Sequence, residues 1–268
     1  MFSPELHKSH LRLAWDLARR DLEAKYRRSV LGPFWLVLTP LCLLGIYSLV
    51  FGQIFGISWP AGPHAPAKGG VGFVLPFFVG LVSYLLLSDA VNSSASLFAS
   101  KRTFVVKSPF PIWVLWLSNL ERALVHGAIS LFLLLVLAIA QQRLSVTGVI
   151  WLVPALVMCV AFVSALSLLL AALGPFVGDI SEAVRLLLRV LFYATPITYP
   201  LSLVPQPFRD LMWLNPLTCM VELLRNPIVF GQPAPAVAMA GFAVGTALLA
   251  MVAAWIFSRV KGVVSDVV

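Results

Sequence analysis

The sequence predicts an all-α integral membrane protein with six transmembrane helices, an N-terminal amphipathic interface helix and re-entrant short helices before the last span. Its composition, its long apolar runs and the placement of its basic residues all indicate this fold class. Of the 268 residues, 60% are hydrophobic and only 11% are charged, whereas charged residues make up about 25% of a soluble domain. Because so little charge cannot cover a water-facing surface of this size, we expect lipid to cover most of the molecule.

Six apolar stretches predict the membrane spans, because a helix needs about 20 residues to cross about 30 Å of hydrocarbon. They cover about residues 35–57, 72–99, 112–140, 148–173, 186–199 and 236–257. Residues 200–235 carry seven prolines among apolar residues. Since proline interrupts a helix, we expect a re-entrant outer segment of short helices there. The transmembrane domain therefore extends over residues 35–257, and a tail follows at 258–268.

The basic residues predict the orientation of these spans, because Lys and Arg are enriched in cytoplasmic segments. With the N-terminus inside, the inside segments carry 14 of the 19 basic residues and the outside segments carry four. The remaining one, Arg122, lies within a predicted span. We therefore expect a multi-pass protein with both termini, including the tail at 258–268, in the cytoplasm.

Two basic segments on the cytoplasmic side are candidates for contacts with a partner. Within residues 1–34, five residues recur at spacings of three and four and so share one helical face: Leu11, Trp15, Ala18, Leu22 and Tyr26. Such a helix lies in the membrane interface, either as a simple anchor or as a docking surface. The second segment, Ser100–Pro111, is a short basic turn bounded by prolines. It is either a plain connector or a rigid contact for a partner.

A polar stripe runs along the second predicted span. Ser88, Asn92, Ser96 and Ser100 lie four residues apart, and Asp89 and Ser93 lie beside them. Polar groups at this depth either bond to a neighbouring helix or line a wet conduit. The carboxylate of Asp89 is the most informative of them, because it is costly in a membrane unless it is wet or paired.

Two further groups of residues lie nearer the predicted outer side. Aromatic residues gather there, at Trp59, Phe192, Tyr193, Tyr199, Phe208 and Trp213. They form either an interfacial belt or stacking surfaces for sugar rings. Glu222 and Arg225 are three residues apart and can pair on one helical face, whereas the adjacent Glu121 and Arg122 point to different sides of a helix.

The sequence predicts no catalytic site and no metal site. It contains no GxxxxGK[ST] loop to hold ATP phosphates, no HExxH and no GxSxG. The three cysteines, Cys42, Cys159 and Cys219, have no CxxC spacing, and the four histidines are not grouped as ligands. We therefore expect a chain that is not an enzyme and has no cofactor of its own.

Several stretches in order resemble type-2 ABC exporter permeases, the transmembrane subunits of ABC exporters. They are LARRDLEAKYRRSVLGPFWLVLTP at 17–40, KSPFP at 107–111, GDI at 178–180, TPITYPLSLVPQP at 195–207, WLNP at 213–216 and ELLR at 222–225. Within that group the sequence is most similar to the polysaccharide export permeases for O-antigen, capsular polysaccharide and teichoic acid. The likeness covers nearly the whole chain, and it is the ordered combination of the pieces that is specific.

The resemblance implies a homodimer in the bacterial inner (cytoplasmic) membrane that binds two copies of a cytoplasmic ABC ATPase, which carry ATP and Mg. The cargo would be a lipid-linked polysaccharide, with no role for nucleic acid. The expected ATPase-docking residues are Trp15, Arg19, Arg20, Lys25, Arg27, Arg28, Lys101, Arg102 and Lys107. The candidates for lining the conduit are Ser88, Asp89, Asn92, Ser93, Ser96, Phe192, Tyr193 and Tyr199.

Other functions compatible with such a chain are a drug or small-lipid ABC exporter permease, an integral membrane glycolipid enzyme and a passive channel. The compact outer loops favour polymer export over the drug exporter. The enzyme needs carboxylates gathered on one aqueous side, whereas Asp89 and Asp179 are expected near the inside and Asp210 and Glu222 near the outside.

Overall fold

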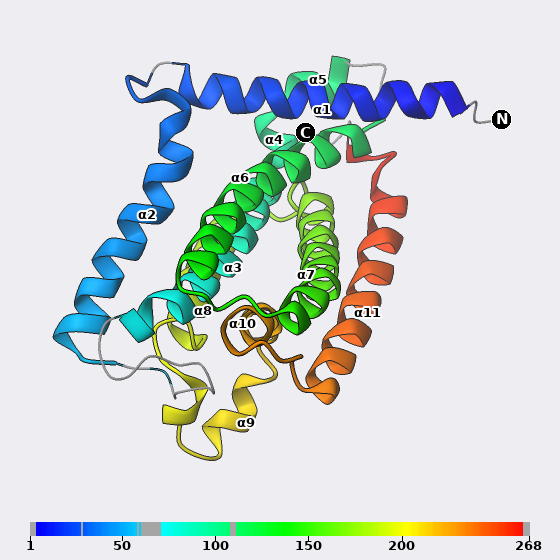
Figure 1. Cartoon of the computed structure of the whole chain (residues 1–268). Coiled ribbons are helices and arrows are strands. Elements are labelled where there is room, and N and C mark those ends of the chain that lie inside the picture. Colours follow the sequence, from blue (N-terminus) through cyan, green and yellow to red (C-terminus); the bar gives the residue numbers. More distant parts are fainter. Residues whose placement is uncertain (1–3, 28, 58, 60–70, 108–110, 265–268) are drawn as a thin grey trace.

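The computed structural model describes residues 4–27, 29–57, 59, 71–107 and 111–264, and all regular structure in this part of the chain is helical. The long helices run beside one another, and α1 (Pro4–Tyr26) lies across one end of them (Figure 1). The described C-terminal end reaches the same end of the molecule (Figure 1). The predicted fold class, an all-helical membrane protein, is confirmed.

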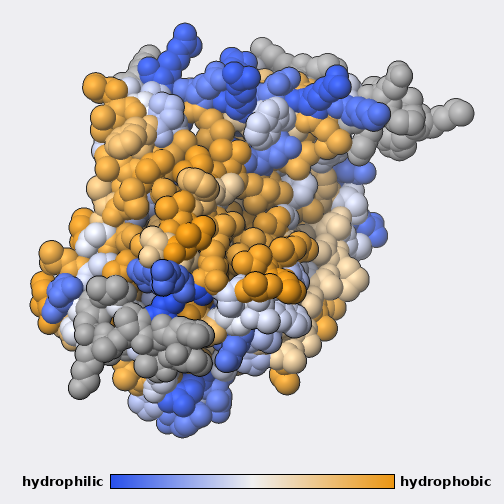
Figure 2. All heavy atoms as spheres, in the orientation of Figure 1, coloured by the Kyte–Doolittle hydropathy of each residue, from blue (hydrophilic) through white to orange (hydrophobic). Residues whose placement is uncertain are grey.

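Five stretches of the described residues are long and apolar enough to cross a membrane, judged by length and composition. The first is Gly32–Ile54, which consists of η1 (Gly32–Phe34), α2 (Trp35–Tyr47) and η2 (Ser48–Ile54). The other four belong to α3 (Val71–Ala95), α6 (Trp113–Ala140), α7 (Val146–Leu173) and α11 (Ala236–Val260). On the face seen in Figure 2, apolar side chains cover the middle and polar ones gather at both ends. This distribution is typical of a protein whose middle is surrounded by hydrocarbon.

The predicted span over 186–199 is wrong in its bounds. The helix there, α8, extends over Ile180–Ala194 and has 15 residues, fewer than the roughly 20 that cross a bilayer. It ends because Thr195 precedes Pro196 and adopts an extended conformation, since a proline disfavours the helical region for the residue before it.

The second predicted span, 72–99, also ends early, because α3 stops at Ala95 and is followed by α4 (Leu97–Ser100) and α5 (Arg102–Lys107). The hydroxyls of Ser93 and Ser94 donate to the carbonyls of Asp89 and Ala90, at 2.6 and 2.7 Å. Such bonds compete with the helical ladder and favour bending, which explains the break at this point.

Short helices fill the predicted re-entrant segment, namely η3 (Leu201–Leu203), α9 (Phe208–Met212), α10 (Pro216–Arg225) and η4 (Asn226–Phe230). α10 begins sharply, because the side chain of Asn215 accepts from the backbone N–H of Leu217 at 2.9 Å and Pro216 fits the first turn. α9 lies at the end of the molecule opposite α1 (Figure 1).

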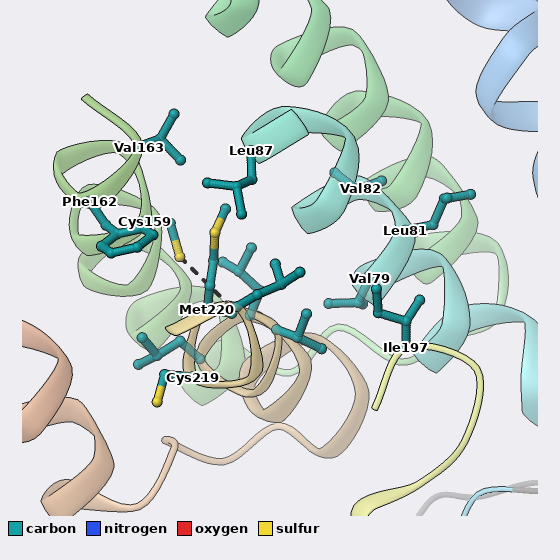
Figure 3. Packing of buried hydrophobic residues seen from close by; sticks show 14 of the residues in the cluster. Val79, Leu81, Val82, Leu87, Cys159, Phe162, Val163, Ile197, Cys219 and Met220 are labelled. Atoms are coloured by element: carbon teal, nitrogen blue, oxygen red, sulfur yellow. Dashed lines mark hydrogen bonds between the residues drawn. The ribbon is translucent and has the colours of Figure 1, made fainter. Parts of the chain in front are cut away.

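The core is built around α3 and α10. Met220 of α10 lies between Val82 and Leu87 of α3 and Cys159 and Val163 of α7 (Figure 3). In an apolar stretch of 18 residues within α3, 67% is buried inside the chain, against 6% of the corresponding stretch in the first span. α3 is therefore the central helix, while the first span presents most of its surface outward.

Candidate functional site

A cavity of about 510 Å³ lies where α1, α2, α3 and α6 meet. Lys25 and Tyr26 of α1 lie on one side of it. Trp35 and Pro40, which belong to the first span, lie on another side. α3 contributes four of the predicted conduit residues, Ser88, Asp89, Asn92 and Ser93. Helical spacing explains why these residues gather, since positions three and four apart share a face.

The hydroxyls of this stripe are largely satisfied within α3 itself. Ser88 donates to the carbonyl of Leu85 at 3.2 Å, and Ser93 donates to that of Asp89 at 2.6 Å. Ser96 is exposed but does not line the cavity. The polar character of the cavity therefore comes chiefly from its charged and amide side chains.

Asp89 is the centre of a charged network that joins α3 to α6. Nη1 of Arg122 donates to both carboxylate oxygens of Asp89, at 3.2 and 3.1 Å, and Nδ1 of His126 lies 2.8 Å from Oδ2. Nη2 of Arg122 also donates to Oδ1 of Asn119 at 3.3 Å, and the Asn119 amide donates to Ser94. The Asp89 side chain is 28% exposed, so this carboxylate is both paired and accessible from the cavity.

Sequence reasoning found Asp89 but missed Arg122 and His126 as its partners. The signal was present, because these two residues are four apart and therefore share one face of a predicted span. What the sequence lacked was the pairing of that face with α3, which tertiary packing decides.

Lys25 and Tyr26 bring the C-terminal end of α1 to the cavity. Nζ of Lys25 lies 5.6 Å from the centre of the Tyr26 ring, within the range of a cation–π contact. Partial burial and then the nearby Asp89 carboxylate raise the pKa of Tyr26 above its usual value, while Arg122 opposes this. The Tyr26 hydroxyl is therefore neutral at physiological pH.

The face of α1 that packs within the chain differs from the predicted apolar face. Ala14 and Ala18 are fully buried as α1 packs against α6, whereas Leu11 and Trp15 are exposed. Small side chains make this contact because they allow α1 to approach α6 closely. The buried face is thus rotated from the predicted one, and Trp15 points outward.

Most of the expected ATPase-docking residues are exposed, and two of them form ion pairs. Trp15, Arg19, Arg20, Lys25, Arg27 and Arg102 are exposed. Arg19 pairs with Glu23 at 2.8 Å, and Lys101 forms an ion pair with Asp21 that joins α1 to the α4–α5 turn. Arg28 and the side chain of Lys107 lie outside the described residues.

The structure separates the three aromatic conduit candidates. Phe192 is buried and packs edge-on against Tyr84 and Tyr193, at 4.9 and 5.2 Å between ring centres. Tyr193 is exposed, and the hydroxyl of Tyr199 donates to the Tyr193 carbonyl at 3.1 Å. Phe192 therefore packs the interior of this chain, whereas Tyr193 is the aromatic side chain of the three with the most open surface.

A second charged cluster, called the outer cluster after the predicted orientation, lies in the N-terminal part of α3. Arg225 of α10 is 1% exposed, and it donates from Nε to the Pro76 carbonyl at 3.2 Å and from Nη2 to the Pro196 carbonyl at 2.8 Å. Its third contact is an ion pair with Glu222, and its guanidinium carbon lies 5.0 Å from the centre of the Trp59 ring. The predicted pairing of Glu222 with Arg225 is confirmed. The cluster joins three parts of the chain: α3, α10 and the segment that follows α8.

Neither cluster has the composition of a metal centre. In the described residues, no three His, Cys, Asp or Glu side chains lie together as potential ligands. Both clusters instead combine one carboxylate with an arginine, an arrangement that serves helix packing and the binding of polar ligands.

Comparison with known proteins identifies a family. The family model for the ABC-2 type transporter matches residues 12–229, a range that includes both charged clusters. The O-antigen export system permease protein RfbA of Myxococcus xanthus is 31% identical over 208 residues, covering 77% of this chain and 76% of that protein. RfbA of Klebsiella pneumoniae is 23% identical over 250 residues, covering 91% and 90%. The polysialic acid transport protein KpsM of Escherichia coli is 22% identical over 213 residues, covering 79% of each chain.

Proposed function

The chain belongs to the ABC-2 type transporter family, and we propose that it is the membrane-spanning permease subunit of an ATP-driven exporter of lipid-linked polysaccharide. The observation that carries this proposal is the family match over residues 12–229, which extends from α1 to η4. The O-antigen and polysialic acid relatives support a polysaccharide of the O-antigen or capsule type as the cargo.

ATP and Mg bind to a separate cytoplasmic ATPase, present in two copies. The missing GxxxxGK[ST] loop supports this division of labour. The docking surface is the exposed basic side of α1, with Arg19, Arg20 and Arg27, together with Arg102 on α5. The ion pair between Asp21 and Lys101 ties α1 to the α4–α5 turn, so a push on either segment moves both. Since α1 packs on α6, the motion passes from there into the spans.

Two copies of the permease form the conduit in the bacterial inner membrane, with both termini in the cytoplasm. The outward-facing first span and the exposed apolar residues of α8, such as Leu186, Leu187 and Val190, support a protein contact there. The bias of basic residues toward the α1 side supports the orientation. The exposed Tyr193 supplies an aromatic surface on which sugar rings can stack.

Removing the partner tests the division of labour. The purified permease alone should hydrolyse no ATP, whereas its complex with a partner ATPase should do so, and a strain that lacks the permease should lose surface polysaccharide. Robust hydrolysis by the permease alone would contradict the proposal, as would normal surface polysaccharide in the deletion strain.

Charge reversal tests the docking surface. In the double variant Arg19→Glu and Arg20→Glu, the ATPase should co-purify at a small fraction of the wild-type amount, because like charges then replace the basic surface. Arg143→Glu, on the connection between α6 and α7, is the matched control and should leave co-purification unchanged. Equal recovery of the ATPase with both sets of variants would make α1 a lipid anchor only.

A further inference from the structure

The cavity at the end of α1 has a polar side and an apolar side. Lys25, Asp89 and His126 lie on the polar side, whereas Trp35, Leu36 and Pro40 lie on the apolar one. We propose that this cavity binds the phosphate head of a lipid from the leaflet on which α1 lies, with Lys25 and His126 contacting the phosphate.

The depth of the cavity matches that of a lipid head group. α1 lies across the end of the long helices (Figure 1), and its surface in Figure 2 is rich in hydrophilic side chains. A basic amphipathic helix of this kind lies at the boundary between head groups and acyl chains. Lys25 and Tyr26 are at the end of α1 and line the cavity, so a helix in this position would place the cavity at the level of lipid phosphates.

The charges around the cavity favour an anion. The carboxylate of Asp89 is matched by the guanidinium of Arg122, so these two charges cancel. In the part of the chain that the structure describes, Lys25 forms no ion pair with a carboxylate. One positive charge is therefore left for a ligand, and it attracts an anion.

His126 offers a hydrogen-bonding atom that the protein does not use. Because the Asp89 carboxylate can only accept, Nδ1 of His126 carries the proton in their 2.8 Å contact. Its other nitrogen, Nε2, is buried and has no hydrogen-bond partner among the described residues. A buried polar atom without a partner is uncommon in a native protein and calls for an external one. A phosphate oxygen accepts from Nε2 of the protonated ring, and a phosphate hydroxyl donates to Nε2 of the neutral ring.

Asp89 and Arg122 are positioning residues in this site. Asp89 fixes the orientation of the His126 ring, and Arg122 holds Asp89 through two hydrogen bonds while Asn119 holds Arg122. This arrangement orients the imidazole in advance, as the outer partners of a liganding histidine do in other sites.

A second cavity extends the apolar side. It has a volume of about 260 Å³, is lined almost wholly by apolar side chains, including Leu131 and Val160, and shares Leu86 and Gly127 with the first. The two cavities thus have a common wall. The polar and apolar sides of the first cavity suit a ligand with a phosphate head and a hydrocarbon chain better than free inorganic phosphate, and the second cavity adds apolar space beyond Leu86.

Two classes of lipid carry this chemistry: glycerophospholipids and polyprenyl phosphates or diphosphates. The second class rests on the proposed function, since a lipid-linked polymer needs such a carrier. Binding of glycerophospholipids would support the site even if the proposed export function were disproved. Failure of the site and failure of the export function can therefore be told apart.

Native mass spectrometry of the delipidated full-length permease in mild detergent tests the site. The probes are dioctanoyl phosphatidylglycerol and farnesyl diphosphate, each with its phosphate-free counterpart, dioctanoylglycerol and farnesol, and inorganic phosphate alone. The variants are Lys25→Glu and His126→Phe, and Arg20→Glu is the matched control because it reverses an exposed charge on α1 away from the cavity.

We expect phosphate-bearing lipids to bind, and each cavity variant to weaken binding about tenfold or more, as the loss of a charge-assisted hydrogen bond does. Arg20→Glu should bind as the wild type does. Binding of both lipid classes, or of either one, supports the site and identifies the class of lipid that supplies the phosphate. Equal binding of the phosphate-free lipids would overturn the proposal, as would equal losses in Lys25→Glu and Arg20→Glu. The thermal unfolding of His126→Phe is checked first, and Lys25→Glu, an exposed position, decides if that variant is unfolded.

Discussion

The two charged clusters on α3 use similar groups but differ in how fully the protein satisfies them. In the outer cluster, Arg225 is 1% exposed and its donors reach two backbone carbonyls and Glu222. In the inner cluster, Asp89 is 28% exposed beside a cavity, and Nε2 of His126 has no partner among the described residues. The outer cluster is complete within the chain, whereas the inner one has polar capacity left over.

This difference indicates different roles for the two regions. A fully satisfied buried cation stabilises one arrangement of the helices that surround it, because any movement leaves a charge without partners. Among the described residues, Nε2 of His126 has no hydrogen-bond partner and Lys25 forms no ion pair at contact distance, so this cluster accommodates a ligand without losing its own bonds. We therefore interpret the outer cluster as a structural clamp on the short helices of residues 200–235 and the inner cluster as a binding site.

Replacing Arg225 should have the largest effect on stability. Arg225→Leu leaves Glu222, whose side chain is only 12% exposed, without its counter-charge and removes the bonds to Pro76 and Pro196. Breaking a buried pair in this way costs about 3–5 kcal/mol, so thermal unfolding in detergent should occur at a much lower temperature.

The double variant Arg225→Leu with Glu222→Leu is the control for this prediction. It removes both charges and should recover part of the loss, since the remaining cost is that of the backbone bonds. Unchanged stability in Arg225→Leu would mean that the outer cluster is not a clamp.

Asp89→Asn should have a smaller effect on stability and a clear effect on lipid binding. The amide is nearly the same size, but it removes the negative charge that Arg122 and His126 share. Hydrogen bonds to charged groups contribute about 1.5–3 kcal/mol, and access from the cavity brings the loss toward the lower end. The measurements are thermal unfolding and lipid binding in the same preparation. A loss as large as that of Arg225→Leu would show that the two clusters do not differ in kind.

The contrast between the clusters was only partly visible in the sequence. The spans, the short helices among the prolines and the pairing of Glu222 with Arg225 follow from local patterns, namely apolar length, proline spacing and positions three apart. The end of α8 at Ala194 was also encoded locally, in the Thr195–Pro196 step, but apolar length outweighed it in the prediction.

The remainder depends on contacts between distant segments. Asp89 meets His126 across 37 positions of sequence, and Arg225 meets Pro76 across 149. No local periodicity contains such pairings. The face of α1 that packs against α6 was not apparent in the sequence for a similar reason, because large apolar side chains mark an amphipathic face, whereas Ala14 and Ala18 make the tight contact with α6.

Gly80 offers a sharper test of the outer clamp. A Cβ added there would lie 3.1 Å from Cγ2 and 3.2 Å from Cα of Ile197, and 3.2 Å from Nη2 of Arg225. Neither neighbour can move easily, since one contact is backbone and the guanidinium is held by its bonds. We expect Gly80→Ala to cost about 1–2 kcal/mol, as overpacking does. Gly241→Ala in α11, where no atom lies within 4 Å, is the control and should be neutral or slightly stabilising. Equal unfolding temperatures for the two variants would mean that the clamp is loose.

Gly127 should give the smallest change in stability, although its nearest contact is the shorter one. A Cβ there would lie 2.7 Å from Cδ1 of Leu86, but that atom is the end of a flexible side chain bordered by two cavities. Leu86 can therefore turn aside, and the helical preference for alanine offsets part of the strain. We expect Gly127→Ala to change unfolding by less than about 0.5 kcal/mol and yet to weaken lipid binding, because Leu86 then occupies space in the cavities. A stability loss larger than that of Gly80→Ala would show that the inner region is packed as rigidly as the outer one, which would leave no room for a ligand.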